Sequence, residues 1–346
     1  MRFTLLVLIC FILFAGHRAQ AQDPQFSQFY AAPLYLNPAF AGSTQYTRAG
    51  MNYRNQWPSI EANFVTFSGY IDHFFESKNS GVGLLFMHDK EGRAGLKSTS
   101  VALQYAYQLQ ITGNLFFRPG FQVAWFNRNV NFADLTFGDQ FNEFGEVIQP
   151  TGEVFGNTNK SFLDLSAGGV LYTPNAWLGF SANHLNTPRQ SFEENVEIEE
   201  LPIKYSIHGG YKIQFKPGVM GSGLFARRQE RSLTPTFQYK SQGEFDQFDL
   251  GLYLTLEPVI IGAWYRGLPI KQIDGFNNNE SIVFLLGFTK KGPEDTFNIG
   301  YSYDYTISQL GTASGGAHEI SLSYIWSNRD PRKPPKDVMR IPCPDF

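Results

Sequence analysis

The residues that could carry out acid–base chemistry in this chain are few and belong to no recognised catalytic motif. Asp304 ends the stretch Gly300 to Asp304, and His318 and Glu319 are adjacent, so these three side chains could in principle supply a general acid and a general base. No nucleophile or leaving-group site is identifiable beside them, and polar residues of this kind usually satisfy one another by hydrogen bonds. We therefore expect no enzymatic activity.

Metal and nucleotide chemistry have no motif in the sequence either. No P-loop, Gly-x-Ser-x-Gly elbow or His-Glu-x-x-His pattern is present. Beyond residue 21, the histidines are His73, His88, His184, His208 and His318. None of them has Cys or another His at metal-ligand spacing, so we expect structural or solvated roles for them and no bound metal or cofactor.

The first residues have the features of a secretory signal peptide. Arg2 precedes an uncharged apolar run over residues 5–16, and Ala-Gln-Ala at residues 19–21 forms a small-residue cleavage site. We expect residues 1–21 to be removed. Cys10 would leave with them, so Cys343 would have no disulfide partner within the chain.

Charge and hydropathy narrow the class of protein further. Cleavage would remove Arg2 and Arg18 but no acid, which lowers the formal net charge from −3 to −5. A nucleic-acid partner is therefore not expected, because neutralising phosphates needs a clustered positive excess. No apolar stretch of about 18 or more residues follows the signal, and a mean hydropathy of −0.24 is too polar for a helical membrane protein.

The elements that must position these side chains are strands, because hydrophobicity alternates with a two-residue period. In residues 101–110 one face carries Val101, Leu103, Tyr105, Tyr107 and Leu109, and the other carries Ala102, Gln104, Ala106, Gln108 and Gln110. Residues 299–307 and 319–326 repeat the pattern. In an exported chain, strands with one apolar and one polar wall predict a barrel with lipid outside and polar side chains inside.

We predict fourteen strands, near residues 46–56, 62–73, 80–88, 97–110, 115–127, 161–172, 176–185, 203–215, 232–240, 246–256, 258–267, 281–290, 296–306 and 317–326. The predicted connections at 111–114, 172–175 and 257–258 are tight, and those at 128–160, 186–202, 268–280 and 307–316 are long, as in outer-membrane barrels. Closure from and to the same side requires an even count. Residues 219–227 are therefore assigned to an inner connection and not to a fifteenth strand.

A soluble β-sandwich or propeller would also have alternating strands, and periodicity alone does not exclude it. The outer faces of so many strands in a soluble domain should carry more Lys and Glu than a chain with 17% charged residues supplies. The favoured fold is therefore an all-β, transmembrane antiparallel barrel of about fourteen strands over residues 46–326.

Three segments outside the predicted barrel strands have distinctive compositions. Residues 22–45 are irregular and are predicted to lie in the lumen as a plug or beneath it in the periplasm. Residues 193–200 form an acid cluster, which is either a solvated face or a surface that selects ligands. Residues 327–346 form a basic, Pro-rich periplasmic tail, which is either disordered or a docking segment for a partner.

A set of short motifs spans the chain from residue 23 to residue 346. They are Asp23-Pro24-Gln25-Phe26-Ser27-Gln28-Phe29-Tyr30, Asn37-Pro38-Ala39-Phe40-Ala41-Gly42, Tyr53-Arg54-Asn55-Gln56-Trp57, Tyr105-Ala106-Tyr107, Trp264-Tyr265-Arg266-Gly267, Gly300-Tyr301-Ser302-Tyr303-Asp304, Ala317-His318-Glu319-Ile320 and Cys343-Pro344-Asp345-Phe346. In their residues and their order along the chain, these motifs resemble those of the PorP/SprF family of the type IX secretion system of Bacteroidetes. One departure is Gly315-Gly316-Ala317, where Gly-Ser is expected in a loop.

The resemblance implies a non-enzymatic outer-membrane barrel of the type IX secretion or gliding machinery. Such a barrel would support export and surface retention of a specific adhesin-like protein through its C-terminal targeting domain, which we place on outer loops 128–160 and 186–202. The implied partners are outer-membrane lipid, that secreted protein and, through the C-terminal tail, periplasmic type IX components. The alternatives are a passive channel or hydrophobic-solute transporter, since fourteen strands enclose a lumen, and a soluble surface-binding module.

The motifs supply the candidate structural or partner-binding residues. These are Asp23, Pro24, Phe26, Ser27, Gln28, Asn37, Pro38, Ala39, Gly42, Arg54, Gln56, Trp57, Arg266, Tyr301, Tyr303, Asp304, His318, Glu319 and Cys343.

Overall fold

The computed structural model describes most of the chain beyond the predicted signal peptide. The described residues are 23–44, 46–92, 95–132, 135–152, 158–192, 200–216, 218–220, 227–273, 276–292, 294–308, 311–327 and 339–344. The predicted signal peptide, residues 193–199 of the predicted acid cluster and residues 328–338 of the predicted tail lie outside them.

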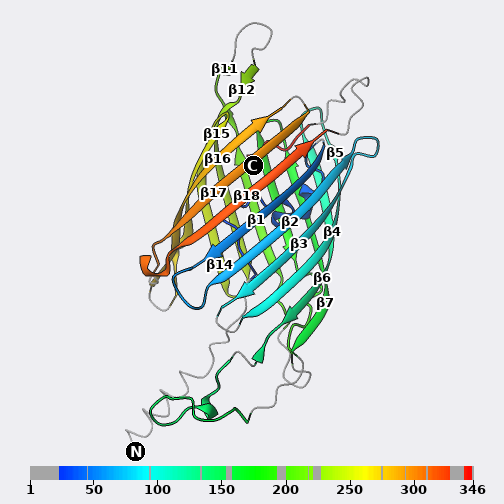
Figure 1. Cartoon of the computed structure of the whole chain (residues 1–346). Coiled ribbons are helices and arrows are strands. Elements are labelled where there is room, and N and C mark those ends of the chain that lie inside the picture. Colours follow the sequence, from blue (N-terminus) through cyan, green and yellow to red (C-terminus); the bar gives the residue numbers. More distant parts are fainter. Residues whose placement is uncertain are drawn as a thin grey trace, which may run out of the picture.

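Fourteen long strands of the described residues form one closed antiparallel barrel (Figure 1). Strands that follow one another along the chain are neighbours in the barrel wall. The first and last of them close the barrel, with Thr47 opposite Trp326 at one end of the seam and Gln56 opposite Ala317 at the other. The predicted fold class is confirmed.

The strands are β1 (Thr47–Gln56), β2 (Phe64–Phe75), β3 (Ser80–Glu91), β4 (Leu96–Tyr107), β5 (Leu109–Gln110), β6 (Phe116–Asn129), β7 (Asn159–Tyr172), β8 (Ala176–Asn183), β9 (Lys204–Tyr211), β10 (Ile213–Gln214), β11 (Gly218–Met220), β12 (Arg227–Gln229), β13 (Arg231–Gln242), β14 (Phe245–Leu256), β15 (Val259–Ile273), β16 (Phe276–Lys291), β17 (Asp295–Thr306) and β18 (Ala317–Trp326). The helical turns are α2 (Pro33–Leu36), η1 (Pro38–Phe40), η3 (Gly138–Gln140) and η5 (Thr312–Ser314). None of the helices in the described residues is long and apolar enough to cross a membrane.

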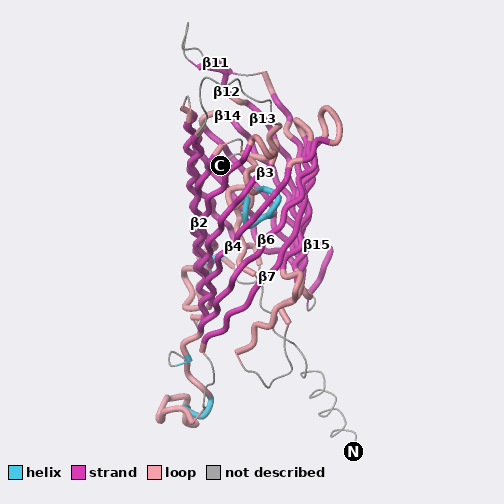
Figure 2. The backbone as a smooth tube through the Cα atoms, turned by 90° about the vertical axis from the view of Figure 1, so that its right-hand side faces the viewer, coloured by secondary structure: helices cyan, strands magenta, loops and turns pink. Residues whose placement is uncertain are grey.

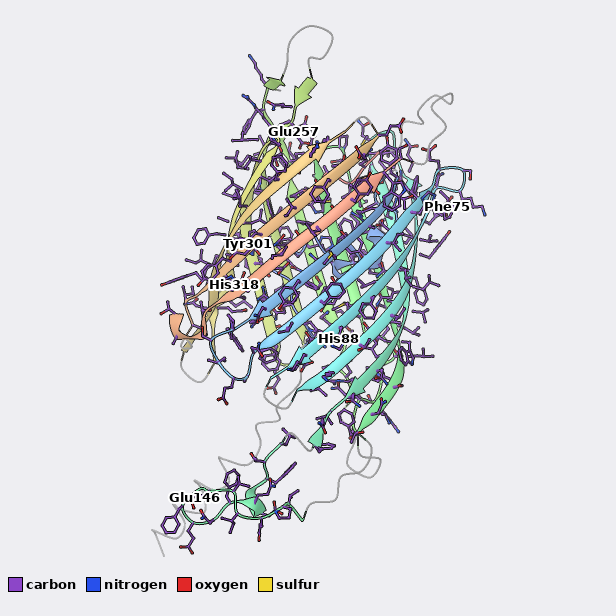
Figure 3. The ribbon with its side chains drawn as sticks, viewed as in Figure 1. Phe75, His88, Glu146, Glu257, Tyr301 and His318 are labelled. Atoms are coloured by element: carbon purple, nitrogen blue, oxygen red, sulfur yellow. The ribbon has the colours of Figure 1, made fainter. Side chains whose placement is uncertain are left out.

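The two-residue alternation of the sequence is visible in the exposure of the side chains. On β4, Leu103 is 63% exposed on the outer surface, whereas the next residue, Gln104, is 1% exposed and donates to the Leu34 carbonyl inside the barrel. Large apolar side chains on many strands, such as Leu163 on β7 and Leu286 on β16, are exposed on the outer face of the barrel. Figure 3 shows side chains projecting outward from the strands. A surface this apolar around a closed sheet is the lipid-facing band of a membrane barrel.

One predicted loop, residues 268–280, is wrong. Strands β15 and β16 extend through most of it and leave only residues 274–275 between them. Pro269 and the asparagines at 277–279 disfavour regular pairing, but register shifts after Arg266 and after Leu268 show that bulges absorb the irregularity. The hairpin therefore continues where composition indicates a loop.

The prediction for residues 219–227 is confirmed. Strands β11 and β12 flank this segment and pair only with each other, in a separate two-stranded sheet. Figure 1 shows this hairpin projecting beyond one end of the barrel. It therefore adds no strand to the wall.

The two ends of the barrel differ in the lengths of their connections. Residues 46 and 327 lie at the same end, which we call the inner mouth, together with the turns 76–79 and 173–175 and the hairpin β11–β12. The connections 130–158 and 184–203 lie at the opposite end, which we call the outer mouth. Long loops are extracellular in outer-membrane barrels, which assigns the outer mouth to the outside of the cell.

Residues 23–44, which we call the lumen segment, run inside the barrel from the outer mouth to the inner mouth. Asp23 accepts from Lys204 near the outer mouth, and the backbone N–H of Gly42 donates to Asp72 of β2 near the inner mouth. The turns α2 and η1 lie between these points, surrounded by strands (Figure 2). The lumen is therefore occupied along its length by the protein's own chain.

A second segment, residues 339–344, packs at the inner mouth. The Tyr172 hydroxyl donates to the carbonyl of Met339 over 3.2 Å, and Ile341 is buried. Cys343 packs against the same apolar cluster and forms no disulfide within the described residues. The C-terminal part of the chain thus covers the end of the lumen opposite to Asp23.

The exposed apolar band predicts a large cost for a charge at its centre. Leu286→Arg should lower the free energy of unfolding of the barrel in lipid bilayers by about 2–4 kcal/mol, because the cation would have to enter the hydrocarbon layer. The matched control is Phe144→Arg, which changes an exposed apolar residue of an outer loop and should cost less than about 0.5 kcal/mol. Equal costs, measured by urea unfolding in bilayers, would contradict a lipid-facing exterior.

Candidate functional site

The lumen segment is held by a cluster of buried polar side chains, which we call the anchor cluster: Ser27, Gln28, Arg54, Arg266, Asp304 and Glu319. The backbone N–H groups of Ser27 and Gln28 donate to the Glu319 carboxylate over 2.6 and 3.1 Å. The Ser27 hydroxyl donates to Asp304 over 2.6 Å. Strand alternation places both carboxylates on the inner wall, on neighbouring strands β17 and β18.

Two arginines balance these carboxylates from other parts of the wall. Arg54 on β1 lies 2.9 Å from Asp304 and 3.4 Å from Glu319. Arg266 on β15 lies 3.0 Å from Asp304 and 2.7 Å from Asp249 on β14. Because every one of these groups is buried, removal of one partner would leave an uncompensated charge away from water.

The amide of Gln28 completes the cluster. Its Nε2 donates to the Ser302 hydroxyl and to the Glu319 carbonyl, and its Oε1 accepts from Ser321 over 2.6 Å. The side chain is fully buried, yet both ends of its amide are hydrogen-bonded. Such a complete set of partners fixes the position of the lumen segment against the last two strands.

Further along, the wall is hollowed by glycine so that the backbone of the lumen segment can approach. A Cβ added at Gly120 on β6 would lie 2.3 Å from the backbone nitrogen of Ala39, and one added at Gly81 on β3 would lie 1.9 Å from the carbonyl oxygen of Ala41. Between them, Arg118 of β6 donates to the carbonyls of Ala39 and Ala41. The fit is therefore between two backbones and leaves no room for a side chain.

Aromatic residues fill the middle of the lumen. The Tyr30 ring packs edge-on against Trp177 of β8, and the Trp177 indole N–H donates to the Tyr30 hydroxyl over 2.9 Å. Phe29 packs against Trp264 of β15 in the same manner. The centre of the lumen is thus a small hydrophobic core.

At the outer mouth the lumen segment ends on a charged group of side chains. Asp23 lies 2.9 Å from Nε2 of His184 and 2.5 Å from Nζ of Lys204, and Nδ1 of His184 lies 2.7 Å from Asp164. Burial disfavours the imidazolium, but Asp23 and Asp164 outweigh it and raise the pKa of His184 to about 9. Burial likewise opposes ionisation of Asp23, but His184 and Lys204 hold its pKa well below the usual range.

Beyond the outer mouth, residues 135–152 form an ordered loop with an apolar face. Phe141 and Val147 form an isolated antiparallel bridge, and the Asp139 carboxylate accepts from Thr151 and from the backbone N–H of Gly152. Phe144 is nevertheless 87% exposed and Ile148 63% exposed. Figure 1 shows the loop standing clear of the barrel wall. A preorganised surface of this kind is suited to contact another protein.

The structure brings most of the sequence candidates together inside the barrel. Those in contact with, or part of, the lumen segment are Asp23, Pro24, Phe26, Ser27, Gln28, Asn37, Pro38, Ala39, Gly42, Arg54, Asp304 and Glu319. Arg266 lies beside them in the wall, 3.0 Å from Asp304. Gln56 joins them because its Oε1 accepts from Arg54 over 3.2 Å. Cys343 lies at the inner mouth.

Four candidates lie elsewhere. Tyr301, Tyr303 and His318 are on the outer face, where His318 Nδ1 is 2.8 Å from the Tyr301 hydroxyl (Figure 3). Strand alternation therefore separates His318 from Glu319, and these two adjacent residues do not form an acid–base pair. Trp57 follows β1 at the outer mouth and packs edge-on against Phe64.

Several residues that hold the lumen segment were not among the sequence candidates. They are Arg48, Asp72, Gln104, Arg118, Asp164, His184 and Lys204. Arg118 shows the signal that could have found some of them: it is a lone charge after two phenylalanines, Phe116 and Phe117, at an inward position of a predicted strand. A buried charge at such a position needs a partner inside the barrel.

Comparisons with known proteins found a matching family model and similar solved structures. A family model described as "Type IX secretion system membrane protein PorP/SprF" matches residues 18–324. No curated protein matches the chain. Among solved structures, Omp33 of Acinetobacter baumannii aligns over 83% of this chain and 99% of its own, with 9% identity and a TM-score of 0.39. A Pseudomonas aeruginosa FadL homologue aligns over 86% and 94%, with 12% identity and a TM-score of 0.41. A deletion mutant of the TodX monoaromatic hydrocarbon channel aligns over 85% and 92%, with 10% identity and a TM-score of 0.44.

The anchor cluster predicts that Arg54→Met weakens the hold on the lumen segment. The change leaves Asp304 and Glu319 without their nearest cation and should cost about 3–5 kcal/mol of unfolding free energy. In planar bilayers we expect no steady current from the unaltered protein and intermittent or steady currents from the variant. Lys97→Met on the exposed end of β4 is the control and should stay silent. A large steady current from the unaltered protein would show that the lumen segment does not close the barrel.

The outer-mouth charges predict a loss of stability at high pH. The pKa of His184 is about 9 in the fold, against about 6.5 in an unfolded chain. The contribution of the His184 ion pairs to the unfolding free energy is therefore complete below about pH 6.5. It is lost as the pH rises through about 9, and the loss is on the order of 3 kcal/mol. The unfolding free energy in detergent, measured from pH 6 to pH 10, should show this fall.

The His184→Gln variant should be less stable than the unaltered protein at pH 6, and its unfolding free energy should not fall in this way as the pH rises. The control is His88→Gln, which changes a histidine that is hydrogen-bonded to Thr99 and remote from Asp23, and this variant should keep the fall in unfolding free energy. An unchanged pH profile in the His184 variant would contradict the assignment.

Proposed function

The chain belongs to the PorP/SprF family of type IX secretion system membrane proteins, and we propose that it supports export of one specific protein and retains that protein at the cell surface through the protein's C-terminal targeting domain. The chain is an outer-membrane component of this system. In our proposal its role is non-enzymatic, and the exported partner is adhesin-like and linked to gliding. The periplasmic components of the system are proposed to contact the C-terminal tail.

The observation that carries the proposal is the ordered apolar loop at the outer mouth. Phe144, Val147 and Ile148 are exposed on a loop that is held by its own hydrogen bonds and stands outside the lipid-facing band. Exposed apolar groups on a fixed loop favour association with a protein, because little conformational freedom is lost on binding. The surface faces outward, where an exported protein would be retained.

The occupied lumen supports a holding role over the alternative of a passive channel. The lumen segment is buried along its length and is hydrogen-bonded to the wall through the anchor cluster, and the inner mouth is covered by residues 339–344. A solute would have to displace these contacts in order to pass. The conductance measurement on the Arg54 variant also tests this alternative.

Deletion of the protein should release the exported partner into the medium or block its export. Phe144→Ser combined with Ile148→Ser should have a similar effect on retention, because it removes the apolar contact surface, while the barrel still reaches the outer membrane in normal amount. Glu143→Ser on the same loop is the matched control, since it changes an exposed polar residue. Surface display is measured by protease accessibility and antibody labelling of intact cells. Unchanged display in the deletion strain would contradict the proposal.

A further inference from the structure

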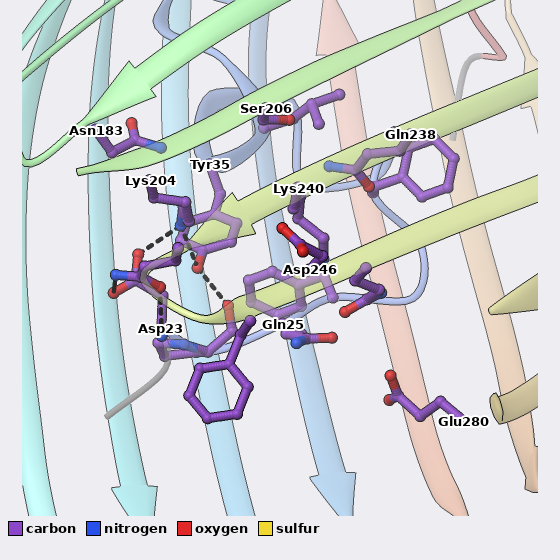
Figure 4. A pocket seen from close by; sticks show the side chains of 17 residues that line it. Asp23, Gln25, Tyr35, Asn183, Lys204, Ser206, Gln238, Lys240, Asp246 and Glu280 are labelled. Carbon is purple, nitrogen blue, oxygen red and sulfur yellow. Dashed lines mark hydrogen bonds and ion pairs between the residues drawn. The ribbon is translucent and has the colours of Figure 1, made fainter. Parts of the chain in front are cut away.

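A cavity of about 280 Å³ opens at the outer mouth, between the lumen segment and the wall (Figure 4). The lumen segment contributes one side of it through Asp23 to Phe26, Phe29 and Tyr35. Strands β9, β13, β14 and β16 contribute the other side. The volume is near the lower end of the range of small-ligand sites. It would hold roughly nine water molecules, so it can take the end of a peptide chain but no folded domain.

The cavity contains a lysine, Lys240, that is within electrostatic range of Asp249 and Glu280 but contacts neither carboxylate. Lys240 on β13 is only partly buried and makes no hydrogen bond or ion pair with any described residue. The three acidic residues that line the cavity contact other groups: Asp23 contacts Lys204 and His184, Asp246 accepts from the Tyr239 hydroxyl, and Glu280 lies 3.8 Å from Arg266. The Lys240 ammonium can therefore take an anionic group of a ligand as its contacting partner.

Two buried polar atoms of the same cavity also lack partners. The Ser206 hydroxyl and the Gln247 Oε1 make no hydrogen bond within the described residues, although these side chains are only 3% and 8% exposed. Buried polar atoms without partners are uncommon in folded proteins and mark places where a further group can bind. Serine can donate to a carbonyl, and the Gln247 oxygen can accept from an N–H.

These three groups match the end of a polypeptide. A C-terminal residue presents an anionic carboxylate, its own backbone N–H and the carbonyl of the preceding residue. Lys240, Gln247 and Ser206 can satisfy these three groups in turn. The apolar part of the cavity, formed by Phe26, Phe29 and Phe245, can receive an apolar side chain.

We propose that this cavity binds the C-terminal residue of a polypeptide, with Lys240 on its carboxylate, Gln247 on its N–H and Ser206 on the preceding carbonyl. The inference rests on the proposed function, because the polypeptide end that reaches the outer mouth is then that of the retained protein. It deepens that function by giving the partner a second point of attachment, separate from the apolar loop. The lumen segment forms part of this site as well as closing the lumen.

The test uses the full-length barrel in detergent and three small probes. N-acetyl-alanyl-phenylalanine with its carboxylate should bind, and the same compound with a C-terminal amide should bind about tenfold or more weakly, because it cannot pair with Lys240. Free phenylalanine, the third probe, lacks the preceding carbonyl and should also bind more weakly. Binding is measured by isothermal titration calorimetry.

Lys240→Gln should weaken binding of the carboxylate probe to the level of the amide probe. Lys97→Gln changes a residue outside the cavity and should leave the binding of every probe unchanged. Ser206→Ala should weaken binding of the carboxylate probe and of the amide probe by the same factor. Because the Ser206 hydroxyl has no hydrogen-bond partner among the described residues, this variant should keep the stability of the barrel. Equal binding of acid and amide, no binding of any probe, or equal binding of free phenylalanine and the dipeptide would overturn the inference.

A cell experiment separates this inference from the proposed function. Release of the partner in the deletion strain, together with no probe binding, would overturn the cavity assignment and leave the retention role standing. Unchanged display in the deletion strain, together with Lys240-dependent probe binding, would overturn the retention role.

Discussion

The structure depends on a set of buried charges that joins the two ends of the barrel sequence to the segment inside it. Arg54 lies on the first strand, Asp304 and Glu319 lie on the last two, and all three contact Ser27 of the lumen segment. Buried ion pairs contribute little net stability, because desolvation offsets much of the attraction, but they tolerate few alternative arrangements. The cluster therefore specifies where the lumen segment lies and which strands meet at the seam.

The same constraint links the closed lumen to the outer surface. Three contacts anchor the lumen segment: the hydrogen bond from Ser27 to the Asp304 carboxylate, the close approach of its backbone to Gly120, and the ion pairs of Asp23. The outer end of the segment is therefore held in place at the outer mouth. That end forms one side of the outer cavity. A barrel that holds another protein needs a fixed outer face more than an open lumen. The lumen segment serves both ends, because it closes the lumen and also forms one wall of the outer cavity.

Much of the fold was predictable from the sequence, because a strand alternation such as that of residues 101–110 repeats a physical period that the structure must follow. The anchor cluster was partly predictable: Arg54, Asp304 and Glu319 belong to motifs, although nothing in the sequence indicated that Ser27 would lie between them. Gly120 and Lys204 could not be assigned, since their role depends on a chain that approaches from inside the barrel. The loop predicted at 268–280 was wrong because bulges are set by pairing across strands, which local composition does not describe.

The contacts of Ser27 with the last two strands constrain the order in which the protein can assemble. Its hydroxyl meets a carboxylate 277 residues later in the chain, and the Gln28 N–H meets one 291 residues later. These contacts cannot exist until synthesis and export across the inner membrane are nearly finished, so chaperones must keep a long, uncommitted polypeptide soluble. The sheet must then wrap around residues 23–44 before β1 pairs with β18. A bulky fusion placed just ahead of Asp23, at the outer mouth, would have to be carried across the membrane while the barrel closes.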